Sequence, residues 1–298
     1  MTDRSLTLSA PAKINLYLGV HTERDDRGYH RVDSLMAAVG LSDTVTVTPA
    51  QALTVQTVPA SDFPMQKNTA YRAAVAMADH YGREANICVT IEKRIPLCAG
   101  LGGPSTDAAA VIVALAELWG IDRIDPALDD IARGIGADVP FFLHASPAFY
   151  VGGGDVLATE YPALPATPVV LVKPREASVS TIEAYRRFDE APVPADKPGV
   201  IASTLRAGDA ETAYALIHNN LGVISAQMEP QIQTVLDWLH KQDGTVAVDV
   251  CGSGACSFAI CDTAVTAERL ADAAQQNGWW SCATQFIPNT VRVEVPKK

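Results

Sequence analysis

The chain has 298 residues, of which 48% are hydrophobic and 19% charged, a balance typical of a folded globular protein. Its formal net charge of −11 argues against a nucleic-acid or anionic-membrane binder, because such proteins hold phosphates with clustered Lys and Arg. The longest apolar run, 108–116, is too short for a membrane helix of about 20 residues, and the N-terminus lacks an apolar signal segment, so we expect a cytoplasmic protein.

The first half of the chain alternates strand-like and helical patterns. Period-two alternation predicts strands at 6–10 and 14–18, followed by a polar turn at 23–28. The ranges 44–48 and 53–58 are expected to form a strand pair. Further strand and helix patterns follow: helices at 69–81, 105–119 and 126–133, and a strand at 87–91.

A cluster of prolines at 162–168 marks a change in composition, and mixed patterns continue after it. The expected helices are 182–188, 211–217, 230–240 and 264–275, and the expected strands are 169–172, 246–250, 257–261 and 291–295. Helices and strands alternate without a regular βαβ repeat, which predicts an α+β fold with two lobes. We place the division after residue 162, giving domains 1–162 and 163–298.

The segment 96–107, Pro-Leu-Cys-Ala-Gly-Leu-Gly-Gly-Pro-Ser-Thr-Asp, lies between a predicted strand and the most strongly predicted helix. Glycines allow close approach to a ligand, and a helix N-terminus offers unpaired N–H groups, so the segment suits phosphate. It is neither a P-loop, because it lacks the Gly-Lys-Ser/Thr ending, nor a Rossmann loop, because Ser105 replaces the third glycine. The alternative is an ordinary turn that Ser105 caps; three glycines exceed what capping needs.

Two other glycine clusters carry weaker signals. Residues 152–154 are expected to form a hairpin or tight turn. Residues 252–254 lie between two predicted strands, so they are not a dinucleotide-binding turn, and Cys251 stands where a serine-hydrolase elbow requires glycine. The six cysteines form no Cys-x-x-Cys pair, which indicates reduced thiols rather than a metal or disulfide framework.

Four residues are candidates for chemistry, and each has two interpretations. Asp138, in Gly-Ala-Asp-Val-Pro-Phe-Phe, is either a desolvated base or a helix cap before a strand. Lys13, within a strand pattern beside Asn15, lies on a solvated face or pairs with a carboxylate or phosphate in a cleft. Tyr29 and His30 either contact a planar ring or simply open a strand.

Together these segments resemble the GHMP kinase superfamily, whose members phosphorylate small-molecule alcohols with ATP. The loop at 96–106 is similar to its phosphate-binding motif, and 252–254 to its C-terminal glycine motif. Residues 11–16, 28–30, 136–142 and 179–181 with Tyr185 narrow the resemblance to the branch that acts on a cytidine-diphosphate-linked methylerythritol. The matching segments span about nine-tenths of the chain in the expected order. The resemblance implies an N-terminal lobe similar to ribosomal protein S5 and a ferredoxin-like C-terminal lobe.

The resemblance also implies a role for each candidate residue. Asp138 would be the base that takes the proton of the substrate 2-hydroxyl, and Lys13 would stabilise the transferring phosphoryl group. Asn15, Tyr29, His30, Thr181 and Tyr185 would line the substrate site. The implied ATP site comprises Pro96, Leu97, Cys98, Ala99, Gly100, Leu101, Gly102, Gly103, Pro104, Ser105 and Thr106, with Asn68, Thr69 and Lys93 around the adenine. Mg²⁺ is expected with ATP, without an identified ligand.

The chain departs from the superfamily pattern at both glycine motifs. Pro104 stands where a third consecutive glycine is usual, and Thr106 replaces Ser. Cys251, Ala255 and Cys256 replace what are usually Ser, Pro and Thr. Two alternatives follow: another GHMP small-molecule kinase, or a non-catalytic nucleotide-binding protein on the same scaffold. A third, an RNA-binding protein, conflicts with the charge of −11.

Overall fold

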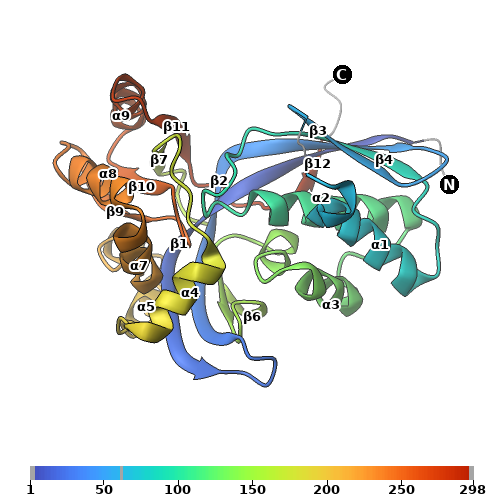
Figure 1. Ribbon diagram of the computed structural model, residues 1–298, viewed down its shortest axis with the longest axis horizontal. Coiled ribbons are helices and arrows are strands. Elements are labelled where there is room, and N and C mark those ends of the chain that lie inside the picture. Colours follow the sequence, from blue (N-terminus) through green and yellow to red (C-terminus); the bar gives the residue numbers. More distant parts are fainter. Residues whose placement is uncertain (1–3, 61–62, 295–298) are drawn as a thin grey trace.

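Two long neighbouring strands, β1 (Leu6–Arg24) and β2 (His30–Pro49), run from one half of the molecule to the other (Figure 1). The structure, a computed structural model, describes residues 4–60 and 63–294. The strands pair antiparallel, with Lys13 opposite Ala38 and Asn15 opposite Met36. Register shifts at Pro11/Ala12 and Asn15/Tyr17 bend the pair on either side of these two polar residues.

The first sheet has the strand order β12-β1-β2-β4-β3, with β5 and β8 also pairing with β2 and β1. Its other strands are β3 (Thr54–Val58), β4 (Ile87–Glu92), β5 (Ala148–Val151), β6 (Val156–Glu160), β8 (His218–Asn219) and β12 (Arg292–Val293). The expected pairing of 44–48 with 53–58 is wrong, because β4 lies between them. The alternating buried Ile87, Val89 and Ile91 suit a central strand, whereas the more polar β3 stays at the edge.

Three helices cover one face of this sheet (Figure 1). They are α1 (Thr69–Tyr81), α2 (Gly103–Trp119) and α3 (Pro126–Ile135), and a short 3₁₀ helix (Pro140–Leu143) follows them. Helix α2 is apolar on all sides and is almost wholly buried against α1 and β1. A buried helix of this kind holds its N-terminus in a fixed position, and that N-terminus ends the glycine-rich segment.

The second sheet is antiparallel in the order β11-β7-β10-β9. Its strands are β7 (Pro168–Lys173), β9 (Thr245–Val250), β10 (Ser257–Cys261) and β11 (Trp280–Gln285). Around it lie α4 (Thr181–Glu190), α5 (Gly199–Arg206), α6 (Ala210–Tyr214), α7 (Asn220–Met228), α8 (Pro230–His240) and α9 (Ala264–Gln276). Helices α8 and α9 pack on one face of the sheet, and the other face packs against Ala12, Ile14 and Leu16 of β1.

The expected α+β class is confirmed, as are the predicted helices 69–81, 126–133, 230–240 and 264–275 and the hairpin turn at 152–154. The sequence interpretation missed β5, β6, β11, α5 and α7, and it extended α6 to residue 217. Position 295 of the last predicted strand lies outside the described residues. The division after residue 162 remains a prediction. In the described ranges, no helix is both long and apolar enough to cross a membrane.

Candidate functional site

The glycine-rich segment forms a loop between β4 and α2. Gly102, with a φ of 75°, is the N-cap of α2, so the helix begins at Gly103 and the alternative of a turn capped by Ser105 is wrong. Gly100 also has a positive φ of 73°, which explains the need for glycine. Pro104 occupies the first turn of α2, where a backbone N–H would have no intrahelical partner. The proline therefore costs the helix no hydrogen bond.

The loop binds its neighbours through carbonyl groups and leaves its N–H groups free. The carbonyl oxygens of Cys98, Ala99 and Leu101 accept hydrogen bonds from the N–H groups of Ala255, Cys256 and Lys13, at 3.1, 3.2 and 3.0 Å. Within the described part of the chain, the N–H groups of residues 97–103 donate to no other group. A loop that presents only donors, next to the positive end of a helix, attracts an anion.

The two glycine motifs, far apart in the sequence, lie against each other. A Cβ on Gly100 would be 1.8 Å from the carbonyl oxygen of Cys251, so no larger residue fits there. Asn219 stabilises the 252–254 turn, because its Nδ2 donates to the carbonyl oxygen of Gly252 at 2.8 Å. Ala255 and Cys256 bind the loop through backbone N–H groups. The Cys256 bond does not depend on its side chain, and the proline that is usual at position 255 could not donate the Ala255 bond.

Lys13 and Asp138 form an ion pair beside the loop. Lys13 is only 3% exposed, and its Nζ lies 3.4 Å from Asp138 Oδ2 and donates to Asn15 Oδ1 at 2.8 Å. Asn15 in turn donates to Ser34 Oγ at 2.9 Å. Asp138 lies in the turn between α3 and the 3₁₀ helix, caps no helix, and keeps 37% of its side chain exposed. Of the alternatives for these residues, the structure therefore supports the cleft pair.

Lys93 lies at the other side of the loop, in a buried cluster of charges. Its Nζ bonds to Asp107 Oδ2 at 2.7 Å and to Asp43. Burial opposes its charge, but the two carboxylates raise the pKa of Lys93 overall. Burial raises the pKa of Asp107 to about 7, with Asp43 adding to the effect and Lys93 opposing it. Because both carboxylates bind Lys93, its ammonium group positions the start of α2.

Asn68 and Thr69 connect α1 to the glycine-rich loop. Asn68 caps α1 by accepting a hydrogen bond from the N–H of Ala70. Thr69 Oγ1 donates to the carbonyl oxygen of Pro104 at 2.5 Å. The N-termini of α1 and α2 thus meet beside the loop, and Asn68 and Thr69, two of the three residues expected around the adenine, lie there.

His30 and Tyr185 form a ring pair that bridges the two halves of the molecule. Their rings stack with centroids 5.2 Å apart, and His30 Nδ1 donates to the carbonyl oxygen of His21 at 2.7 Å. His30 Nε2 is buried without a hydrogen-bond partner in the described residues, although Asp189 lies 3.2 Å away. Burial, and secondarily Asp138, raises the pKa of Tyr185 to about 12, so its hydroxyl stays neutral.

Tyr29 and Thr181 lie at the edges of this region. The Tyr29 side chain is 62% exposed beneath the Arg27 guanidinium, 5.1 Å from the ring centroid, rather than in the ring pair. Thr181, at the start of α4, shares a hydrogen bond of 2.8 Å with Ser253 Oγ in the second glycine motif. One contiguous region therefore contains the loop, the Lys13–Asp138 pair and the ring pair.

Sequence reasoning missed several residues that hold this region together. Ser34 orients Asn15, and Asp43 and Asp107 hold Lys93. Two adjacent buried asparagines connect the halves: Asn219 supports the second glycine motif, and Asn220 bonds to both the N–H and the carbonyl oxygen of Val20. The Asn-Asn pair directly before an apolar helix was the available signal, since buried amides need partners.

Known proteins match both halves of the chain. The family models for the GHMP kinases N terminal domain and GHMP kinases C terminal match residues 68–146 and 201–278. A curated relative from Desulfitobacterium hafniense, called 4-diphosphocytidyl-2-C-methyl-D-erythritol kinase, is 36% identical over 91% of this chain and 92% of its own length. A relative of the same name from Mycobacterium marinum is 35% identical over 95% of this chain and 89% of its own.

Solved structures agree with these matches. A crystal structure of 4-(cytidine 5′-diphospho)-2C-methyl-D-erythritol kinase superposes with a TM-score of 0.77 at 32% identity, covering 94% of this chain and 99% of that one. Homoserine kinase from Cytophaga hutchinsonii superposes with a TM-score of 0.75 at 19% identity, covering 99% and 98%, and so shares the fold. The two-lobed fold that the sequence resemblance implied is confirmed.

Proposed function

Because the chain belongs to the GHMP kinase family and is an ATP-dependent small-molecule kinase, we propose that it phosphorylates the 2-hydroxyl of 4-diphosphocytidyl-2-C-methyl-D-erythritol, a step of non-mevalonate isoprenoid biosynthesis. The relatives' shared name supports the substrate. The observation that carries the chemistry is the Lys13–Asp138 pair, 3.4 Å apart, beside a loop with free N–H groups. Phosphoryl transfer requires mainly positioning and charge stabilisation, which this arrangement supplies.

In the proposed reaction, Asp138 accepts the proton of the substrate 2-hydroxyl while that oxygen bonds to the γ-phosphorus of ATP. The bond from the γ-phosphorus to the β–γ bridging oxygen breaks, and ADP leaves with the bond's electron pair. Lys13, 3.4 Å from Asp138, neutralises charge on the transferring group. Its Nζ has three N–H donors and a single hydrogen bond, to Asn15, so donors remain for a phosphate oxygen.

The ATP phosphates are proposed to lie on the free N–H groups of residues 97–103 and the first turn of α2. The N–H groups of Leu101, Gly102 and Gly103 lie nearest the positive end of the α2 dipole. Pro104 removes one N–H donor from this series, and the next two residues, Ser105 and Thr106, add hydroxyl groups. Asn68, Thr69 and Lys93 would lie toward the adenine. Free backbone donors support this assignment because they bind phosphate without any added side-chain charge.

The cytidine diphosphate is proposed to lie along Asn15, His30 and Tyr185, with Tyr29 and Thr181 at its ends. The stacked rings of His30 and Tyr185 support this placement, because aromatic rings suit a planar base. The Tyr185 ring faces the same region and is near Asp138, whose charge contributes to its raised pKa. The cytosine would therefore lie on one side of Asp138, the proposed catalytic base, and ATP on the other.

Mg²⁺ is part of the proposal, and the nearby donors suit it. In the described ranges, no three His, Cys, Asp or Glu side chains lie close enough to hold a metal by themselves. ATP phosphate oxygens, the Asp138 carboxylate and the hydroxyls of Ser105 and Thr106 are all hard oxygen donors, and Thr106 Oγ1 has no hydrogen-bond partner there. Bound Mg²⁺ would neutralise phosphate charge.

A coupled assay of ADP release tests the substrate assignment. ATP is supplied with 4-diphosphocytidyl-2-C-methyl-D-erythritol, homoserine or mevalonate in separate reactions. We expect ADP release with the first alcohol alone. Turnover on homoserine or mevalonate instead would assign the chain to another GHMP kinase activity.

We also propose a cytoplasmic location, which the six free thiols support, since all lie in the described part of the chain and none is paired.

A further inference from the structure

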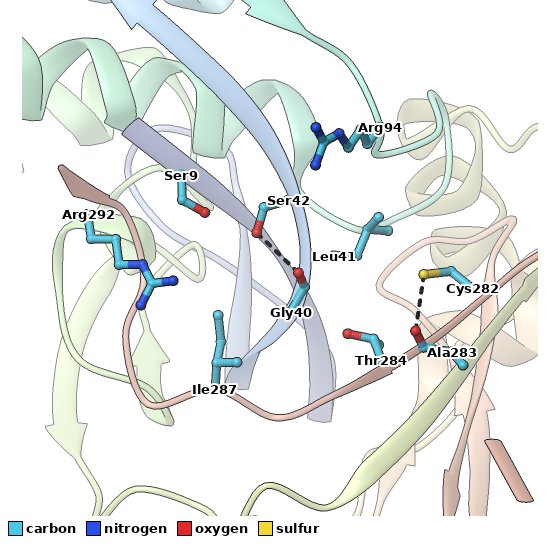
Figure 2. A pocket seen from close by; sticks show the side chains of 10 residues that line it. All are labelled: Ser9, Gly40, Leu41, Ser42, Arg94, Cys282, Ala283, Thr284, Ile287 and Arg292. Atoms are coloured by element: carbon cyan, nitrogen blue, oxygen red, sulfur yellow. Dashed lines mark hydrogen bonds between the residues drawn. The ribbon is translucent and has the colours of Figure 1, made fainter. Parts of the chain in front are cut away.

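A pocket of about 370 Å³ lies away from the Lys13–Asp138 pair, where the two sheets meet (Figure 2). Its walls come from β1, β2 and the segment after β4 on one side, and from β11 and the chain leading to β12 on the other. It is lined by Ser9, Gly40, Leu41, Ser42, Arg94, Cys282, Ala283, Thr284, Ile287 and Arg292. The proposed reaction uses none of these residues.

The pocket lining carries positive charge without a counter-charge. None of its residues is acidic, although the chain has 34 Asp and Glu against 23 Lys and Arg. Burial raises the pKa of the Cys282 thiol, which therefore stays neutral. In a molecule with an acidic surplus, a pocket with two arginines and no carboxylate is a local reversal of the overall charge.

The two arginines are available for a ligand. Most arginines of the described chain bind a carboxylate or a carbonyl oxygen. The side chains of Arg94 and Arg292 have no such partner among the described residues, and both are exposed. Figure 2 shows their guanidinium groups on either side of Ser42 and Gly40. Guanidinium groups that have no carboxylate or carbonyl partner favour binding of a planar or tetrahedral oxyanion.

Hydroxyl and apolar groups complete the pocket. Ser9 and Thr284 have no side-chain hydrogen bond within the described ranges, and Ser42 has only a long one of 3.4 Å to the Gly40 carbonyl oxygen. These hydroxyls add donors for an anion with several oxygens. Leu41 and Ile287 are partly buried side chains in the pocket lining and offer apolar surface (Figure 2). Two cations with three hydroxyls match a phosphate dianion better than a single carboxylate.

We propose that this pocket binds a small phosphate monoester with an aliphatic body. Arg94 and Arg292 bind the phosphate, Ser9, Ser42 and Thr284 donate to its remaining oxygens, and the aliphatic part lies on Leu41 and Ile287. The proposal does not depend on the identity of the kinase substrate, because the pocket shares no residue with the proposed active site.

Calorimetric titration of the full chain with n-butyl phosphate tests the proposal. We expect Arg94→Gln and Arg292→Gln each to weaken binding about tenfold or more, since each loses a charge-assisted contact. Arg206→Gln is the matched control, because Arg206 is another exposed arginine without a partner in the described chain, on α5. We expect it to change the affinity less than about twofold. Circular dichroism verifies that all variants fold.

Two further titrations distinguish binding in this pocket from binding at the ATP loop, and binding of the ester from binding of free phosphate. Binding should persist when excess ADP is present, and inorganic phosphate should bind about tenfold more weakly because it buries no apolar surface. The proposal is overturned if both pocket variants bind like the wild type, if no binding is detected, or if ADP abolishes it. Equal affinity for inorganic phosphate would contradict an aliphatic ligand.

Discussion

Folding buries the charged ammonium group of Lys13, a residue that is only 3% exposed. Burying such a charge is costly unless partners replace the lost hydration. Here Asn15 accepts one hydrogen bond at 2.8 Å and Asp138 supplies the opposite charge at 3.4 Å. In the proposed reaction a phosphate would complete this environment, with Lys13 already held in place for the charge that develops during transfer.

Asp138→Asn tests the proposed base. An amide cannot accept the hydroxyl proton, so we expect turnover to fall by about a thousandfold or more while the KM for the alcohol changes by less than about threefold. Steady-state ADP release measures both constants. Asp130→Asn, on the exposed face of α3, is the control and should keep wild-type turnover. Near-normal activity of Asp138→Asn would refute the base assignment.

Tyr185→Leu tests the proposed base-stacking surface. Leucine keeps an apolar side chain but loses the ring that stacks on His30 at 5.2 Å. We expect the KM for the cytidine-linked alcohol to rise about tenfold, with the KM for ATP nearly unchanged. Ile182→Ala, on the same helix with 85% exposure, should alter neither constant. An equal rise in both KM values would contradict a role specific to the substrate.

At the scale of elements, the site depends on two turns that fit only because they contain glycine. The segment after the turn between β9 and β10 donates two backbone hydrogen bonds to the loop before α2, and Gly100 lies against Cys251. Both turns rest on rigid elements: α2 is buried, and Asn219 holds the second turn. This contact couples ATP binding, proposed for one half of the molecule, to packing in the other half.

Gly100→Ala tests this contact. The added Cβ would lie 1.8 Å from the Cys251 carbonyl oxygen, at a φ of 73° that alanine disfavours. We expect a loss of about 3 kcal/mol or more in unfolding free energy, measured by urea denaturation. Gly134→Ala in α3 meets nothing within 4 Å and should stabilise the chain by about 0.5–1 kcal/mol. A wild-type midpoint for Gly100→Ala would show that the two turns do not pack as described.

The Asp43–Lys93–Asp107 cluster ties β2 and β4 to α2 and gives stability a pH dependence. Burial raises the folded-state pKa of Asp107 from 3.8 to about 7, so the folded chain holds this proton more tightly than the unfolded chain. The associated stability is complete below pH 3.8 and is lost as the pH rises to about 7, by at most roughly 4 kcal/mol.

Asp107→Asn removes that titration. We expect the melting temperature of the wild type to fall relative to this variant as the pH rises from about 4 to about 7, because only the wild type loses the buried proton. Asp272→Asn, on the exposed face of α9, should follow the wild type at every pH. A constant difference between wild type and Asp107→Asn would show that Asp107 does not titrate in this range.

Local patterns predicted the elements whose burial is one-sided or complete. Helices α1, α3, α8 and α9 were predictable from apolar spacing, and the glycine-rich loop from its place between a strand and a helix. The pairing of β3 with β4 and the continuity of β1, predicted as two strands at 6–10 and 14–18, were not, because neighbours distant in sequence decide them. Similarly, motif resemblance proposed Lys13 and Asp138, whereas Ser34, Asp43 and Asn219 became visible only through their hydrogen bonds.

At the scale of the whole molecule, the net charge of −11 coexists with sites for small polyphosphates. An acidic surplus disfavours long polyanions, which require many cations over a wide surface. A nucleotide needs only a few charges and donors, and in the proposed site Lys13 supplies a cation and the backbone N–H groups supply neutral donors. The strands β1 and β2 pass through both halves (Figure 1), and Lys13 and His30 on these strands contact Asp138 and Tyr185 from other parts of the chain.

The most direct test of the central claim is ³¹P NMR of a reaction containing the chain, ATP, Mg²⁺ and 4-diphosphocytidyl-2-C-methyl-D-erythritol. We expect one new phosphomonoester resonance to grow in step with ADP while both diphosphate resonances of the substrate are retained, and no such resonance with Asp138→Asn. A spectrum in which ATP is consumed without a phosphomonoester, or in which the substrate diphosphate is cleaved, would contradict phosphorylation of the 2-hydroxyl.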